Sequence, residues 1–377
     1  MIEPFASRPA PQLVFGPGAL RELPAGVREV GGTAVFLVSD TGLLQAGHVD
    51  RARQLLEGAG IPVAVYDHSH ENPTETDAAT CCAAAQRQKF DCIVALGGGS
   101  SMDTAKACNF LLTNGGAMRD YHGYGKATKP MLPFIAIPTT AGTGSECQSY
   151  ALVSRDDTHE KMACGDPKAR ARLAILDPQL TETQPRSVAV HTSLDALAHT
   201  LESAVCTRRN AMSSLYSDAA FRHIAAAIES VINGRASLDE RGRMQLGAAL
   251  AGLAIENSML GGAHAAANPL TARHSVVHGH AVALMLPHVM RYNAADPHVL
   301  AIYNRYGAIL RETSASTLRL IDWVTELVAQ AGFTSLNGMV TDFSALADDA
   351  TRQWTGQFNP RPLQRADYVA LYERALG

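Results

Sequence analysis

The sequence of 377 residues lacks the features that mark several classes of protein. No apolar run approaches the roughly 18 to 20 residues that a membrane-spanning helix needs, so we expect no contact with a membrane. The formal net charge of -4 gives no basic footprint, which argues against nucleic acid as a partner. The first residues have neither the basic nor the apolar region of a secretory signal, and we therefore expect a cytoplasmic protein.

Cysteine is present but in no metal-binding or redox pattern. The seven cysteines follow no CxxC or zinc-finger spacing, and most of them lie in apolar segments. We interpret them as reduced side chains that pack as small hydrophobes in a cytoplasmic protein. Any metal site in this chain is therefore expected to use other ligands.

What the sequence has is the composition of a soluble globular enzyme, with 46% hydrophobic and 18% charged residues, and a length that suggests two domains. The first half alternates short β-branched runs with Ala-rich stretches of helical period, which predicts a mostly parallel sheet covered by helices. The expected strands are TAVFLVSD (33–40), IPVAVYD (61–67), CIVALGGG (92–99), FIAIPTT (134–140), YALVSR (150–155) and LAILD (173–177).

The pattern changes after residues 177–178. Long stretches rich in Ala and Leu, such as SLDALAHTLESAV and MQLGAALAGLAIENSML, dominate from about residue 187 onward, and β-type alternation disappears. We therefore predict an α/β domain over residues 1–183 and an all-helical domain over residues 184–377.

Two loops follow apolar strands of the first half. Gly97, Gly98, Gly99 and Ser100 lead directly into a helix, so the backbone can approach a bulky ligand and the helix N-terminus can face an anion. The segment IPTTAGTGSE (137–146) carries hydroxyl groups that can bind a sugar or a phosphate. Ligands of open α/β sheets bind at this edge, and the pair of loops indicates a dinucleotide site, although glycine and threonine also occur in ordinary turns.

Asp40 ends the first main strand of the predicted sheet. A carboxylate at this position can accept hydrogen bonds from an adenosine ribose and repel a 2′-phosphate, which favours NAD over NADP. The alternative is that Asp40 caps a helix or a turn.

Asp195 and His199 are four residues apart in the helical stretch HTSLDALAHTLE. One helical turn brings both side chains to the same face, where they can share an ion. Five histidines follow within 25 residues, and we expect His274, His280 and His288 to be ordinary core or surface residues; the five are His264, His274, His278, His280 and His288. One carboxylate and up to three imidazoles suit a divalent iron or zinc ion.

The whole chain resembles the iron-containing (group III) alcohol dehydrogenases. The matching stretches occur in the family's order: PQLVFGPGAL, GGGSSMDTAK, PTTAGTGSE, LDPQLT, DALAHTLE, HGHAVALMLPHVMRYN and NPRP. The resemblance implies an N-terminal dinucleotide-binding domain, a C-terminal helical domain, a site in the cleft between them, and a homodimer. It also implies hydride transfer between NAD(H) and a small alcohol or aldehyde, with Fe²⁺ as the metal and Zn²⁺ as an alternative.

The resemblance also assigns roles to individual residues. The family's metal ligands fall on Asp195, His199, His264 and His278. Its nucleotide-binding residues fall on the first loop with Asp103, on the second loop at Thr139, Thr140 and Thr143, on Asp40 and, with a weaker match, on Lys161.

Three departures from the family pattern point to chemistry specific to this chain. Asn268 replaces the second histidine of HxxxH, Gln148 stands where a threonine is common, and TARH brings Arg273 and His274 toward the expected substrate. Asn268 cannot exchange a proton at neutral pH, so a proton path has to use water, ribose hydroxyls or His274. Arg273 can bind an anionic end of the substrate, as in a semialdehyde or a phosphono- or sulfo-aldehyde; its alternative is a surface or structural ion pair.

Two other functions stay open at this point. A lyase of the dehydroquinate synthase type shares the architecture but needs clustered Lys and Arg groups, which the sequence does not show. A catalytically weak relative that binds metal and nucleotide is suggested by Asn268 alone.

Overall fold

The computed structural model describes residues 4–313 and 319–377, which form two compact units. One unit contains Pro9–Thr140 and Gly144–Gln184, and the other contains Pro185–Gly377 together with Ala141–Thr143 and the segment that ends at Arg8. The short segment 141–143 joins the helical unit because Gly142 packs against Thr192 so closely that a side chain at 142 would overlap it. The sequence pattern alone predicts this segment within the α/β domain.

The first unit is built on a six-stranded sheet in which every pair of neighbouring strands is parallel. This confirms the predicted α/β class. The strand order is β1-β9-β6-β4-β2-β3. The strands are β1 (Gln12–Phe15), β2 (Val35–Val38), β3 (Val63–Tyr66), β4 (Cys92–Gly97), β6 (Phe134–Pro138) and β9 (Leu173–Leu176).

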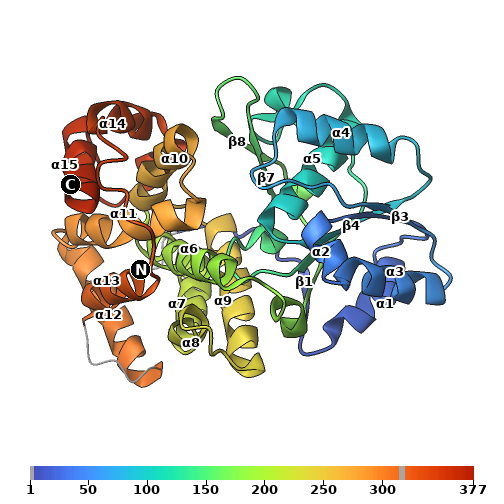
Figure 1. The fold of residues 1–377 in the computed structure, drawn as a ribbon, viewed down its shortest axis with the longest axis horizontal. Coiled ribbons are helices and arrows are strands. Elements are labelled where there is room, and N and C mark those ends of the chain that lie inside the picture. Colours follow the sequence, from blue (N-terminus) through green and yellow to red (C-terminus); the bar gives the residue numbers. More distant parts are fainter. Residues whose placement is uncertain (1–3, 314–318) are drawn as a thin grey trace. The chain divides into compact units, whose positions relative to one another are not determined.

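Both faces of this sheet are covered, because successive side chains of a strand point in opposite directions. Val35 and Leu37 of β2 join a core with α1 and α3, whereas Phe36 and Val38 join a second core with α4 and α5. Figure 1 shows α1 and α3 on one side of the strands and α4 and α5 on the other. The helices of this unit are α1 (Leu23–Glu29), α2 (Thr41–Gln45), α3 (His48–Gly58), α4 (Glu75–Ala85) and α5 (Gly99–Asn114).

A smaller sheet of three strands lies outside the main one. It has the order β5-β8-β7, and β7 pairs with β8 in antiparallel register; the strands are β5 (Gly123–Tyr124), β7 (Tyr150–Ser154) and β8 (Lys161–Gly165). The strand expected at 150–155 is therefore present. The sequence pattern does not predict β1, β5 or β8, because each is a run of two to five residues without clear alternation.

The second unit contains only helices among its described residues, as the sequence predicts. Its central helix α6 packs against α7, α9 and α11 around one hydrophobic core. The helices are α6 (Arg186–Val205), α7 (Ala211–Ala225), α8 (Ile228–Ile232), α9 (Leu238–Glu256), α10 (Gly262–His274), α11 (His278–Asn293), α12 (Pro297–Thr313), α13 (Leu320–Gln330), α14 (Phe343–Arg352) and α15 (Arg365–Leu376). No helix in the described part of the chain has the length and hydropathy that crossing a bilayer requires.

Candidate functional site

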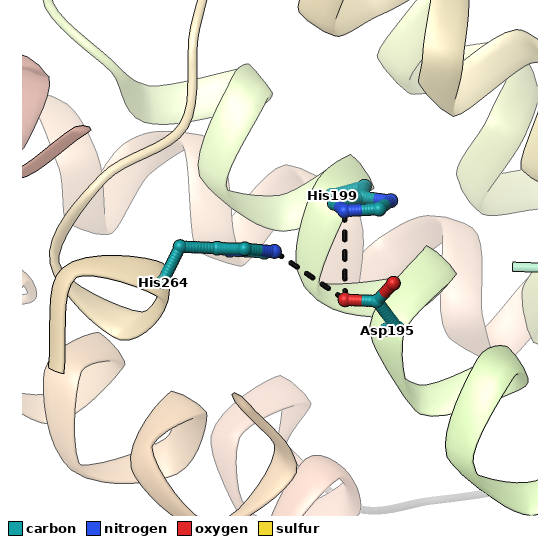
Figure 2. A group of neighbouring side chains, drawn as sticks. All are labelled: Asp195, His199 and His264. Atoms are coloured by element: carbon teal, nitrogen blue, oxygen red, sulfur yellow. Dashed lines mark ion pairs between the residues drawn. The ribbon is translucent and has the colours of Figure 1, made fainter. Parts of the chain in front are cut away.

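Asp195 and His199 project from the same face of α6, as their spacing predicts. The Nε2 atom of His199 lies 3.5 Å from Oδ1 of Asp195, and both side chains are buried. Figure 2 shows the imidazole of His199 directly opposite this carboxylate oxygen. Helix α6 therefore brings one carboxylate and one imidazole together by local geometry alone.

His264 approaches the same oxygen from the first turn of α10. Its Nε2 atom lies 3.3 Å from Oδ1 of Asp195, and its ring stacks on that of His199 with the ring centroids 4.9 Å apart. One donor atom from each of the three residues lies within 4.8 Å of the others. Two segments that are far apart in the sequence thus converge on one point.

His278, the first residue of α11, lies at the edge of this group. Its Nε2 atom is 3.8 Å from Oδ1 of Asp195, and a quarter of its side chain is exposed, compared with a few per cent for the other three. The four predicted metal ligands are therefore brought together, three of them in the interior and the fourth on the more open side.

The donor set fits a divalent metal ion. Oδ1 of Asp195 and Nε2 of His264 are buried and, within the described residues, neither makes a hydrogen bond of ordinary geometry. Buried polar atoms are rarely left in this state unless an ion or a water satisfies them. One carboxylate oxygen and imidazole nitrogens suit Fe²⁺ or Zn²⁺ equally well.

The charges of the cluster favour a cation. Burial alone would raise the pKa of Asp195, but the neighbouring His199, His278 and His264 outweigh it and hold the pKa well below its usual range. Burial lowers the pKa of His199. Asp195 thus stays ionised in the interior, while His199 stays neutral and able to donate a lone pair.

Glu202 also belongs to this site, although it is not among the residues predicted from the sequence. It lies on α6 seven residues after Asp195, is buried, and contacts Nδ1 of His264 through Oε2. Its spacing from Asp195 and His199 places it on the same helix face, and this signal could have revealed it.

Three of the residues that depart from the family pattern, Asn268, Arg273 and His274, lie on α10. The Nδ2 atom of Asn268 donates a hydrogen bond of 2.9 Å to Oε1 of Gln353. Arg273 forms an exposed ion pair with Asp349. His274 is the last residue of α10 and is partly buried. None of the three is in the cluster around Asp195.

In the α/β unit, the first glycine loop joins β4 to α5. A Cβ at Gly97 would lie 2.6 Å from the Cβ of Ser101, so only glycine fits there. Gly98 has an extended backbone and precedes the helix, which begins at Gly99 and continues with Ser100. The loop therefore leaves bare backbone at the N-terminus of a 16-residue helix, which is the arrangement expected of a phosphate cradle.

Asp103 and Lys106, one turn further along α5, face the second loop. The hydroxyl of Ser145 donates to Oδ1 of Asp103 at 3.1 Å. Burial raises the pKa of Asp103 to about 6, although the charges of Lys106 and Lys161 oppose this. Asp103 is thus buried against the second loop, and its role in binding a nucleotide stays a prediction.

The other predicted nucleotide-binding residues are distributed over both units. Thr139 is buried, and its backbone N–H donates to the carbonyl oxygen of Gly97, which joins the two loops; Thr140 is partly exposed beside Gly98. Thr143 lies in the segment that groups with the helical unit, and Lys161 opens β8.

Asp40 caps α2. Its Oδ1 accepts from the backbone N–H of Leu43 at 3.0 Å, and its Oδ2 accepts from the hydroxyl of Ser101 at 3.3 Å. The structure therefore shows the helix-capping role, which is the alternative to ribose binding. The carboxylate stays partly exposed at the end of β2.

Comparison with known proteins decides the family. Residues 10–178 match the model of the iron-containing alcohol dehydrogenases, and residues 189–376 match that of the C-terminal region of the Fe-containing alcohol dehydrogenase family. The chain belongs to the iron-containing alcohol dehydrogenases. It is thus a metal-dependent oxidoreductase of alcohols and aldehydes, which confirms the resemblance noted in the sequence.

Individual relatives show how far this similarity extends. The chain is 31% identical to 1,3-propanediol dehydrogenase of Klebsiella pneumoniae over 96% of both chains. It is 34% identical to long-chain-alcohol dehydrogenase 1 of Geobacillus thermodenitrificans (strain NG80-2), over 97% of both. The crystal structure of a 1,3-propanediol oxidoreductase superposes with a TM-score of 0.90 at 29% identity and covers all of both chains. Relatives at similar identity are thus named for alcohols of very different length.

Proposed function

We propose that this iron-containing alcohol dehydrogenase interconverts a short-chain alcohol and its aldehyde with NAD(H), by means of a divalent ion held by Asp195, His199, His264 and His278. The observation that carries the proposal is the convergence of Asp195, His199 and His264 from α6 and α10 on one buried point. The overall reaction is RCH₂OH + NAD⁺ → RCHO + NADH + H⁺.

The bound ion would supply Lewis acidity to the substrate oxygen, and the nicotinamide would carry the hydride. The protein contributes placement. Asp195 supplies a negative charge in the interior, and His278 lies on the more open side of the ligand set. The amide of Asn268 donates a hydrogen bond to Gln353 and cannot exchange a proton at neutral pH. The alcohol proton therefore leaves through another group or through water.

The nucleotide preference is part of the same proposal. The backbone at Gly97, Gly98 and Gly99 would receive the pyrophosphate, and Asp40 would face the adenosine ribose and disfavour a 2′-phosphate. NAD(H) is therefore the expected nucleotide. A homodimer and a cytoplasmic location remain predictions from the sequence.

The size and charge of the substrate are the finer part of the proposal. A substrate with an anionic end was expected because of Arg273, but its guanidinium group pairs with Asp349 at the surface. Because of this pairing, the structure adds no support for a substrate with an anionic end beyond the sequence pattern. Arg273→Ala tests it: selective loss of activity on anionic aldehydes would restore the idea, and equal losses on neutral and anionic aldehydes would remove it.

The deciding experiment couples metal analysis of the purified protein to an NAD(H) assay. Metal-free protein is reconstituted with Fe²⁺ or with Zn²⁺ in the absence of oxygen and tested with short neutral aldehydes, diols, long-chain alcohols and anionic aldehydes. We expect about one ion per chain and turnover on short substrates, with Asp195→Asn losing both. A protein that binds metal and nucleotide but turns over none of these substrates would be the catalytically weak relative. Net NADH production from a simple alcohol would decide against the lyase.

A further inference from the structure

Glu202 makes two separate contacts with the first turn of α10. Its Oε1 atom accepts a hydrogen bond of 2.7 Å from the backbone N–H of Ala263, and its Oε2 atom contacts Nδ1 of His264. The side chain is only 5% exposed, so these two groups replace the water that a carboxylate normally binds. Each oxygen of Glu202 thus has its own donor.

These contacts determine which nitrogen of His264 is protonated. A carboxylate only accepts hydrogen bonds, so Nδ1 of His264 has to carry the hydrogen that it shares with Glu202. A metal ion that displaces the other ring proton therefore meets the lone pair of Nε2, the atom that lies 3.3 Å from Oδ1 of Asp195. Histidine ligands are commonly oriented by a carboxylate in this manner, which also makes the ring a stronger electron donor.

Asn359 also contacts this turn. Its Oδ1 atom accepts from the backbone N–H of Gly262 at 3.1 Å, and its amide exchanges two hydrogen bonds with Asn293, at 3.0 and 2.7 Å. Gly261, the residue before the helix, provides no side-chain cap. The free N–H groups of Gly262 and Ala263 are therefore satisfied by Asn359 and Glu202 instead.

The two glycines before His264 allow these groups to approach. A Cβ at Gly262 would lie 3.1 Å from Oδ1 of Asn359, and a Cβ at Gly261 would lie 3.2 Å from Oε1 of Glu202. Both distances are shorter than most real Cβ contacts. The sequence GGAH thus provides a helix start that two polar side chains can reach.

We propose that Glu202 is a positioning residue for His264: it fixes the Nδ1–H form of the ring and directs the Nε2 lone pair into the metal site. Asn359 supports it by holding the turn that carries His264. This inference rests on the proposed metal site. It adds a second carboxylate, so that Asp195 and Glu202 together balance the charge of a divalent ion.

The test measures metal affinity rather than activity. Metal-free protein is titrated with Zn²⁺ in competition with a chromophoric chelator, for the wild type, Glu202→Gln, His264→Ala and the double variant. Glutamine has one accepting oxygen and one NH₂ group, so it cannot place an acceptor at both positions that the two oxygens of Glu202 occupy. We expect Glu202→Gln to weaken binding by about 10- to 100-fold. In the His264→Ala background the same change should have little further effect, because Glu202 acts through His264.

Glu256→Gln is the matched control. Glu256 is a buried carboxylate of the same unit, but it pairs with Arg8. We expect this variant to bind Zn²⁺ as the wild type does. Unchanged affinity in Glu202→Gln, or an equal loss with and without His264, would overturn the inference. Failure of the wild type to bind metal would instead overturn the proposed function.

A second measurement does not depend on the folding of any Glu202 variant. Long-range ¹H–¹⁵N spectra of the zinc-loaded wild type, labelled at histidine, report which nitrogen of each ring carries hydrogen. The signals of His264 are those that disappear in His264→Ala. We expect Nδ1 to be protonated and Nε2 to bind zinc, and the opposite assignment would refute the role of Glu202.

Discussion

Lys106 donates hydrogen bonds from its ammonium group to both the carbonyl oxygen and the hydroxyl of Ser145, at 2.6 and 2.9 Å. The carbonyl oxygens of Gln148 and Tyr150 lie 2.9 and 3.0 Å from the same nitrogen, so its three N–H groups are shared among four acceptors. Lys106 is almost fully buried on α5, the helix that follows the glycine loop. This one side chain therefore fixes the end of the second loop, and the segment that follows it, to the helix after the first loop.

The first prediction concerns Lys106→Met. Removing the ammonium group leaves four acceptors and the carboxylate of Asp103 without their buried cation, which costs about 3–5 kcal/mol of unfolding free energy. We also expect NADH affinity to fall at least about tenfold, because the loops lose their common support. Urea unfolding and NADH titration measure the two effects. Lys129→Met, at an exposed position of the same unit, should change neither. A folded Lys106→Met protein with normal NADH affinity would contradict the prediction.

The second prediction concerns pH. Burial raises the pKa of Glu146 to about 7 from an ordinary 4.5, although its own backbone and Lys106 oppose the change. The folded state therefore keeps a proton that the unfolded chain releases. This stabilisation is complete below pH 4.5 and is lost as the pH rises through 7.

Glu146→Gln removes this dependence. Relative to the wild type, the metal-free variant should gain up to about 3 kcal/mol of unfolding free energy between pH 4.5 and 8. Urea unfolding at several pH values measures the difference. Glu160→Gln, which changes an exposed carboxylate of the same unit, should show the same pH dependence of the unfolding free energy as the wild type. The same pH dependence in Glu146→Gln as in the wild type would contradict the prediction.

The third prediction concerns the contact between α11 and α6. Gly279 follows His278 and lies so close to His191 that an added Cβ would overlap its carbonyl oxygen and lie 2.7 Å from its carbonyl carbon. Backbone atoms cannot move aside cheaply, so Gly279→Ala should cost about 1–3 kcal/mol and shift His278 away from the other ligands. Thermal unfolding and Zn²⁺ titration measure both effects. Gly307→Ala in α12 is the control, because its nearest neighbour would be 3.8 Å away; it should be neutral or slightly stabilising. Equal behaviour of the two variants would rule out the steric argument.

The fourth prediction concerns the proton path. Asn268 has no titratable group, so Asn268→His should add an ionisation near neutral pH to the profile of kcat/KM. Asn268→Gln, which keeps an amide, should not. His274→Ala is measured alongside, because His274 is the histidine expected to substitute in proton transfer. If neither Asn268→His nor His274→Ala alters the profile, neither position lies on the proton path.

The sequence predicts the fold class because the patterns that define it are local. Strands such as CIVALGGG are uniform apolar runs that end in glycine, and α6 carries continuous helical periodicity. β1 and β8 were missed because short strands at a sheet edge or in a small sheet have no such pattern. Segment 141–143 was assigned to the other unit because nothing in its residues shows that Gly142 packs on Thr192.

The same division holds for the candidate site. The sequence by itself determines that Asp195 and His199 share a helix face, since a spacing of four residues fixes this through the helical pitch alone. Spacing alone does not say which of the five later histidines reach them: the family resemblance points to His264 and His278, and the tertiary structure brings both to Asp195. Only the tertiary structure shows that Glu202 contacts His264 across 62 positions. These contacts depend on how α10 and α11 pack against α6. Packing is set by the sum of many weak side-chain contacts over the whole unit, so no short stretch of sequence records it.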